Sequence, residues 1–129
     1  MADLLRNATL VAGDTIDYYA LTLSNRSSLP DSHPLKTSGL QTTGYTTRFI
    51  AKPNAADADD AATTIQATLT ATDEDNATMD LPKTATESID FGGAKTLKYE
   101  WKVQTSNGAR TYTLDSGTFV LAADLSIGF

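Results

Sequence analysis

Side chains that could support catalysis or bind a transition metal are few in this sequence. The chain has one histidine, His33, and no cysteine. A Ser-His-Asp triad would depend on a histidine that lies next to Pro34 in a polar segment, and a zinc site could not use a His/Cys cluster. We therefore expect His33 to have no catalytic role and the chain not to be an enzyme.

Carboxylates and glycines give equally weak chemical signals. Asp73, Glu74 and Asp75 offer the oxygen ligands that calcium prefers, but no D-x-D-x-D-G loop with a distal glutamate follows them. They lie between two strand-like runs, as do Asp57 to Asp60, which favours solvated turns. Gly92 and Gly93 have neither the lysine nor the glycine spacing of a phosphate-binding loop. We expect no metal and no other cofactor.

Length and charge narrow the class of protein. A chain of 129 residues is long enough to fold without metal or disulfide. We expect one β-sandwich domain over residues 1–129, whose N- and C-terminal tails could be extended. Sixteen acidic residues against ten scattered basic ones give a net charge of −6, which would repel nucleic acid. The sequence has no apolar run of transmembrane or signal-peptide length, so we expect a mature protein without membrane contact.

The elements that position these residues are predicted to be strands. Along 96–106, Leu97, Tyr99, Trp101 and Val103 alternate with polar residues, the pattern of a strand with one buried face. Asn-Gly follows and predicts a hairpin with a two-residue type I′ turn. This tryptophan-bearing strand is the predicted centre of the core.

Further strands follow from alternation and turn residues, with a β-bulge expected near Tyr18 and Tyr19 and a kink at 115–117. A helical turn is predicted at 84–89 from capping-box spacing, and 54–62 is either a helical turn or an acidic loop. The fold class is all-β, an immunoglobulin-like β-sandwich of about eight strands with one or two helical turns, and a closed barrel is the alternative. The other predicted strands are Leu5–Ala12, Thr15–Ser24, Tyr45–Lys52, Thr64–Thr72, Ala77–Leu81, Arg110–Leu114 and Thr118–Leu121.

Segment 25–43 is the longest stretch without a regular pattern and is predicted to be a surface loop. Loops of this length often carry binding function, and apolar chain ends often insert into a neighbour. Uncovered edge strands are also frequently completed by another subunit. The predicted partner-binding residues come from this loop and from both ends of the chain: Leu4, Leu5, Leu29, His33, Leu35, Leu40 and Phe129.

The order of short motifs resembles a known family. GDT leads into a strand, GYTTRFIAK follows a polar loop, and ATMDLP precedes a Ser/Thr-rich turn. A Tyr/Trp strand, NGARTYTLDSGTF and ADLS complete the order. From about Gly13 to Ser126 this is similar to the small immunoglobulin-like domain of tailed-phage virion proteins, such as the N-terminal domain of upper baseplate proteins.

The resemblance implies a structural protein of the virion, assembled in the host cytoplasm, that docks onto other virion proteins and could form a homo-oligomer. Such domains attach fibres or receptor-binding proteins to a tail or baseplate, and similar folds decorate capsids. The baseplate proteins carry a long C-terminal extension, whereas this sequence ends at Phe129. That departure leaves a neck or cement protein as an equal expectation.

A carbohydrate-binding or adhesin-like sandwich is the alternative function. It would recognise a host surface through exposed aromatic side chains. Trp101, Tyr99, Phe49 and Tyr45 fall on strand faces that are predicted to be buried. Tyr18, Tyr19 and Tyr112 are left open between core packing and glycan stacking.

Overall fold

The computed structural model describes residues 6–23, 25–89 and 91–123, with backbone only for 16–21 and 107. The regular elements of these residues are strands and 3₁₀ turns, which confirms the all-β prediction. The strands are β1 (Thr9–Val11), β2 (Ile16–Thr22), β3 (Thr46–Lys52), β4 (Ile65–Thr68), β5 (Thr70–Ala71), β6 (Asn76–Leu81), β7 (Lys95–Gln104) and β8 (Thr111–Ala122). The 3₁₀ turns are η1 (Arg26–Ser28), η2 (Gly39–Gln41), η3 (Lys83–Ala85) and η4 (Ser106–Gly108).

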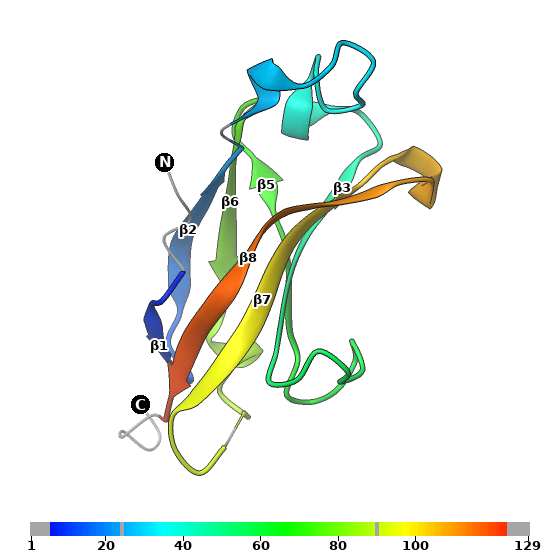
Figure 1. Ribbon diagram of the computed structural model, residues 1–129. Helices are drawn as coiled ribbons and strands as arrows, with labels where there is room; N and C mark the ends of the chain where they lie inside the picture. The colour runs from blue at the N-terminus through cyan, green and yellow to red at the C-terminus, as the bar shows by residue number, and fades with distance from the viewer. Residues whose placement is uncertain (1–5, 24, 90, 124–129) are drawn as a thin grey trace.

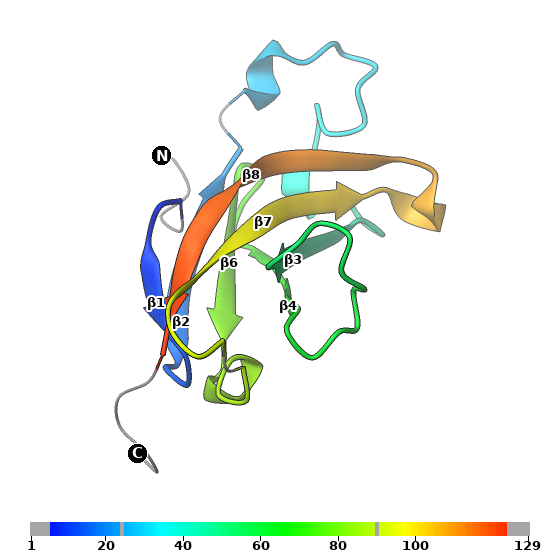
Figure 2. The same ribbon diagram turned by 60° about the horizontal axis from the view of Figure 1, so that its bottom comes forward.

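The strands form two sheets that face each other across one core (Figures 1 and 2). The larger sheet is curled and has the order β1-β8-β7-β3-β4, and the smaller has the order β2-β6-β5. Most neighbours are antiparallel, but β1 runs parallel to β8, with Thr9 opposite Val120. The strand predicted at 64–72 divides at the buried Leu69, so that β4 joins one sheet and β5 the other.

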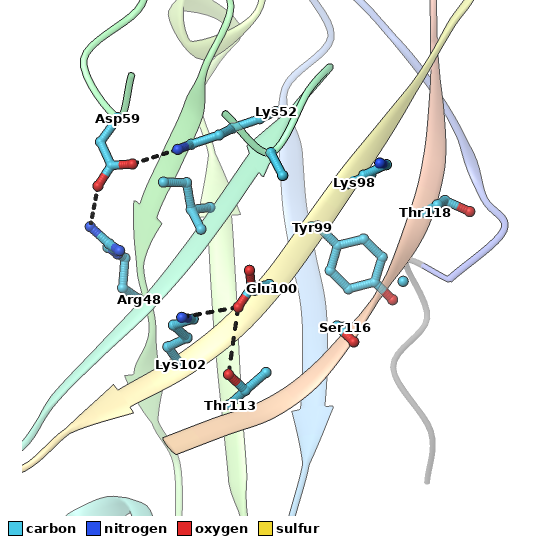
Figure 3. A pocket seen from close by; sticks show the side chains of 13 residues that line it. Arg48, Lys52, Asp59, Lys98, Tyr99, Glu100, Lys102, Thr113, Ser116 and Thr118 are labelled. Carbon is cyan, nitrogen blue, oxygen red and sulfur yellow. Dashed lines mark hydrogen bonds and ion pairs between the residues drawn. The ribbon is translucent and has the colours of Figure 1, made fainter. Parts of the chain in front are cut away.

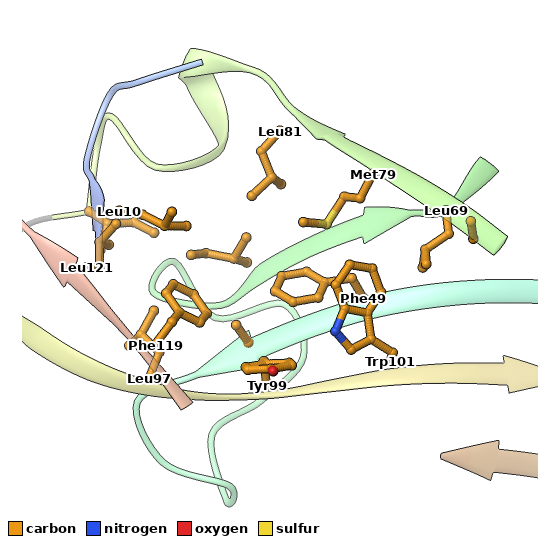
Figure 4. Close-up of a cluster of buried hydrophobic side chains, with 14 of the residues drawn as sticks. Leu10, Phe49, Leu69, Met79, Leu81, Leu97, Tyr99, Trp101, Phe119 and Leu121 are labelled. Atoms are coloured by element: carbon orange, nitrogen blue, oxygen red, sulfur yellow. The ribbon is translucent and has the colours of Figure 1, made fainter. Parts of the chain in front are cut away.

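The tryptophan-bearing strand, β7, is confirmed as the centre of the core. Its alternate residues from Leu97 to Val103 are almost fully buried, while the residues between them face outward. The Phe49 ring on β3 lies 5.0 Å from the Trp101 ring and 5.9 Å from the Tyr99 ring, centroid to centroid (Figure 4). This aromatic cluster joins the two central strands of the large sheet.

The hairpin between β7 and β8 is confirmed, but its predicted two-residue turn is wrong. Gln104 pairs with Thr111, so six residues connect the strands, and they include the turn η4. The Thr105 N–H donates to the Arg110 carbonyl over 2.9 Å, and the Arg110 N–H donates to the Thr105 hydroxyl over 3.0 Å. Because these two bonds close a wider loop, the Asn-Gly pair does not have to make the whole reversal.

One predicted irregularity of strand pairing is confirmed, and the other is displaced. The β2–β6 register shifts between Ile16 and Tyr19, as expected. The kink predicted at 115–117 is wrong, because these residues pair regularly with β7 and the strands predicted on either side of them form one strand, β8. The register shift on β8 lies at Leu114 instead, since Trp101 pairs with Asp115 and Lys102 with Thr113. An extra residue on one strand bends it, and this bend adds to the curl of the large sheet.

Of the two segments for which a helical turn was considered, 84–89 and 54–62, only the first contains one. Residues 83–85 form η3, which confirms a single turn near 84–89, but no side-chain cap bond is made there. The predicted capping box is wrong, because η3 begins after Pro82 and places Thr84 inside the turn. Instead, the Thr86 hydroxyl accepts the Gly13 N–H over 2.9 Å. Segment 54–62 has no helix, so the acidic-loop alternative is the correct one.

Candidate functional site

The predicted partner-binding residues fall into three groups in the structure. Leu4, Leu5 and Phe129 lie outside the described residues. Leu29 and His33 are half-buried on the 25–43 loop. Leu35 and Leu40 are 3 % and 5 % exposed, so their side chains pack inside this chain rather than face a neighbour. Partner binding through this set stays a prediction, with Leu29 and His33 as its accessible described members.

Arg26 braces the 25–43 loop against the acidic turn at 73–75. Its guanidinium donates to the Asp75 carboxylate over 2.6 Å and to the Glu74 carboxylate over 2.8 Å. It also donates to the Lys36 carbonyl over 2.7 Å. One side chain therefore joins the start of the loop to its middle and to the turn before β6.

The His33 ring contacts the Tyr112 ring at a tilt of 41°. The ring centroids are 4.9 Å apart, and the imidazole Nδ1 accepts the Leu35 N–H over 3.1 Å. With one nitrogen bonded to the backbone and the ring against a tyrosine, His33 serves to dock the loop on the start of β8. Among the described side chains, no hydroxyl or carboxylate forms a hydrogen bond with the His33 imidazole of the kind that a catalytic triad requires.

The acidic residues 73–75 form a turn that hydrogen bonds of Asp73 close locally and that Arg26 joins to the 25–43 loop. The Asp73 carboxylate accepts the N–H groups of Asp75 and Asn76 over 2.8 and 2.9 Å. Hydrogen bonds from the Asn76 side chain, followed by the Asp75 N–H, lower the pKa of Asp73 below its ordinary value. No group of three potential metal ligands occurs within the described residues. The sequence interpretation of an ordinary turn fits this geometry.

A groove lies on the outer face of the large sheet, on the side that carries the charged residues of β3 and β7 (Figure 3). Its volume is about 660 Å³, and its floor is formed by β3, β7 and β8. The connection 53–64 forms one wall, from which Ala55 and Asp59 face the groove. We call it the sheet-face groove; its charged residues are Arg48, Lys52, Asp59, Lys98, Glu100 and Lys102.

Strand register arranges the four cations of the groove in two rows. Arg48 on β3 lies directly opposite Lys102 on β7, and Lys52 lies directly opposite Lys98. Like charges at directly opposite positions repel each other and destabilise a sheet. The two rows are separated by the pair of Ile50 and Glu100.

Two carboxylates offset part of this repulsion. Asp59 binds Lys52 over 2.6 Å and Arg48 over 3.4 Å, and Glu100 binds Lys102 over 3.1 Å. The Lys52 hydrogen bond is the main cause that lowers the pKa of Asp59 below its ordinary value. Within the described residues Lys98 has no ion-pair partner. The groove therefore has an excess of positive charge on a chain whose net charge is −6.

Sequence reasoning missed this groove because its cations are scattered singly along the chain. The signal was present in the polar faces of two strands, where Arg48 and Lys52 are four residues apart, as are Lys98 and Lys102. Antiparallel pairing of those strands is what brings the cations together. Strand order, which the sequence did not define, was the missing information.

Comparisons with known proteins do not assign the chain to a family. Neither the protein-family models nor the curated proteins give a match to its sequence. Among the described residues, no helix has the length and apolar character needed to span a membrane. Functional interpretation of this chain therefore depends on its own geometry.

Proposed function

We propose that this chain is an immunoglobulin-like structural protein of a tailed-phage virion and that it acts by docking onto other virion proteins. Strand order supports the proposed fold. The order β2-β6-β5 corresponds to strands B-E-D of an immunoglobulin sheet, and β8-β7-β3-β4 corresponds to G-F-C-C′. The tryptophan differs in place, since Trp101 lies on the strand equivalent to F rather than on C.

One observation carries the docking function: the sheet-face groove combines like-charged rows with Lys98, which has no ion-pair partner among the described residues. Residues that serve stability alone would avoid opposing cations on neighbouring strands. A charged, open sheet face of this kind can bind a protein partner of opposite charge. The attraction between opposite charges also speeds association. The 25–43 loop, braced by Arg26, would add a second contact region.

The partners proposed are other virion structural proteins of the tail, baseplate, neck or capsid surface, with a homo-oligomer as one arrangement. The carbohydrate-binding alternative has less support from the described side chains. Trp101, Tyr99 and Phe49 are at most 2 % exposed, which confirms their predicted burial. Tyr45 was also predicted to be buried, but it precedes β3 and is half-buried, as is Tyr112, whose ring contacts His33. A glycan could therefore not stack on Trp101, Tyr99 or Phe49.

Incorporation of the protein into phage particles tests this proposal. Phage particles that lack the chain are complemented with tagged wild-type protein or with a Lys98→Glu/Lys102→Glu variant, then purified on a density gradient and probed for the tag. We expect the wild type in the particle fraction and loss of the variant. Lys83→Glu is the matched control, because Lys83 is an exposed lysine on η3, outside the groove.

Absence of the wild-type protein from purified particles would refute the proposal. Binding of the isolated protein to a glycan array, combined with that absence, would favour the carbohydrate-binding alternative. Near-ultraviolet circular dichroism of each variant shows whether it retains the native fold, so that a folding defect is not mistaken for a docking defect.

A further inference from the structure

We infer that the sheet-face groove binds an extended acidic peptide segment of a partner, with carboxylates at positions i and i+4 of that segment. This inference names the partner's chemistry and rests on the proposed docking function. It follows from the spacing of the cation rows, their incomplete neutralisation and the shape of the groove.

The spacing of the rows fits an extended chain. Lys98 and Lys102 are four residues apart on one strand, as are Arg48 and Lys52 on the next. A strand rises 3.2–3.4 Å per residue, so the two rows are about 13 Å apart. A peptide in the extended conformation that lies along β7 has the same rise, and its side chains i and i+4 point to the same side. Two carboxylates at that spacing would each meet one row.

The residues between the rows fit the same ligand. Ile50 and Glu100 lie between the cation pairs, where a third carboxylate would be repelled. Position i+2 of the peptide should therefore be neutral or basic. Along β8, Thr118 lies opposite Lys98, so this row continues into a hydroxyl group that can donate to a carboxylate. Thr113 lies opposite Lys102, but its hydroxyl already donates to Glu100 over 3.5 Å.

We expect the row of Lys52 and Lys98 to bind a partner carboxylate more strongly than the row of Arg48 and Lys102, because its positive charge is less fully neutralised. Asp59 is shared between Lys52 and Arg48, and Glu100 already pairs with Lys102. The Lys52 side chain is 16 % exposed, so it is partly desolvated and cannot be screened fully by water. A partner carboxylate between Lys52 and Lys98 would relieve the repulsion that no described residue of the chain offsets at Lys98.

The test uses two fluorescein-labelled peptides of identical composition, ten residues long, in a threonine-rich background. One has glutamates at positions 3 and 7, and the other has them at positions 3 and 4. Fluorescence anisotropy with purified full-length protein in 50 mM salt measures the dissociation constants. We expect the peptide with the wider spacing to bind about fivefold more tightly, because it gains one additional ion pair with the second row.

Variants of the protein locate the binding. Lys98→Ala should raise the dissociation constant of the peptide with the wider spacing about fivefold, and Lys98→Glu should raise it further. The control Lys83→Glu should change this dissociation constant less than twofold. Raising the salt should weaken binding in the wild type. A native Trp101 fluorescence spectrum, from the single buried tryptophan, confirms that each variant is folded.

Equal affinity for the two peptides, or equal effects of Lys98→Glu and Lys83→Glu, would overturn the inference. So would tighter binding of heparin, tested in the same assay, because it would assign the groove to a sulfated polysaccharide. Protein that enters particles but does not discriminate between the peptides would leave the docking function in place and remove only this ligand. If the protein discriminates between the peptides but is absent from particles, the peptide ligand stands and the proposed virion function is refuted.

Discussion

Gly39→Ala is expected to destabilise the protein more than Gly92→Ala, although both glycines have positive φ. Gly39 has φ +53°, and a Cβ atom placed there would lie 2.1 Å from the Glu74 carbonyl oxygen and 2.9 Å from the Arg26 Cδ. The first of these atoms belongs to the backbone and cannot move away by rotating. Residues 39 and 74 would have to separate.

The magnitude has two parts. An alanine in the left-handed region costs about 1–2 kcal/mol relative to glycine. Separation of the two segments would also break the hydrogen bond from the Leu40 N–H to the Glu74 carbonyl, now 2.9 Å, at a cost of about 1 kcal/mol. We therefore expect a total loss of about 2–3 kcal/mol in the free energy of unfolding.

Gly92→Ala is the matched control, because Gly92 also has positive φ, +74°, but its added Cβ would meet no described residue within 4 Å apart from its two neighbours in the chain. It should cost only the backbone term of about 1–2 kcal/mol. Urea unfolding followed by Trp101 fluorescence measures both variants. A difference of less than about 0.5 kcal/mol between them would refute the close approach of Gly39 to Glu74.

Three further predictions concern the core, the wall of the groove and the loop. Phe49→Ala removes a fully buried ring at the centre of the aromatic cluster and should cost about 3–5 kcal/mol in urea unfolding. Asp59 has a lowered pKa in the folded state, so its contribution to stability is present above its ordinary pKa of 3.8 and is lost as the pH falls through the folded value. Asp59→Asn should therefore be less stable than wild type at pH 7, and the two melting temperatures should converge in acid. Arg26→Lys keeps the charge but loses the forked contact with Asp75 and Glu74, and it should increase hydrogen exchange in the 25–43 loop without changing exchange in β7.

Alternation and turn residues were sufficient to predict most strands of this protein. The regular pattern from Leu97 to Val103 identified the central strand and its buried face, because a half-buried strand needs little besides that pattern. The bulge near Tyr19 was also predictable, since no single register could bury both apolar pairs of that segment.

What the sequence could not provide was how distant strands meet. The division of 64–72 at Leu69 preserves alternation on both sides, so a pattern of residues cannot reveal the change of sheet. The parallel pairing of β1 with β8 joins residues more than one hundred positions apart and leaves no local signal. The cation rows depend on the register between β3 and β7, and for that reason the sequence did not reveal the groove. Leu35 and Leu40 were predicted to contact a partner, but both side chains are buried.

The parallel pairing of β1 and β8 also determines how the domain would respond to tension. A pull that separates residue 6 from residue 123 draws the two strands past each other along their length. The bonds from the Asn7 N–H to the Thr118 carbonyl, the Val120 N–H to the Ala8 carbonyl and the Ala12 N–H to the Ala122 carbonyl are then strained simultaneously in shear. Because these bonds are loaded together rather than one at a time, we expect the domain to resist tension along the line through residues 6 and 123.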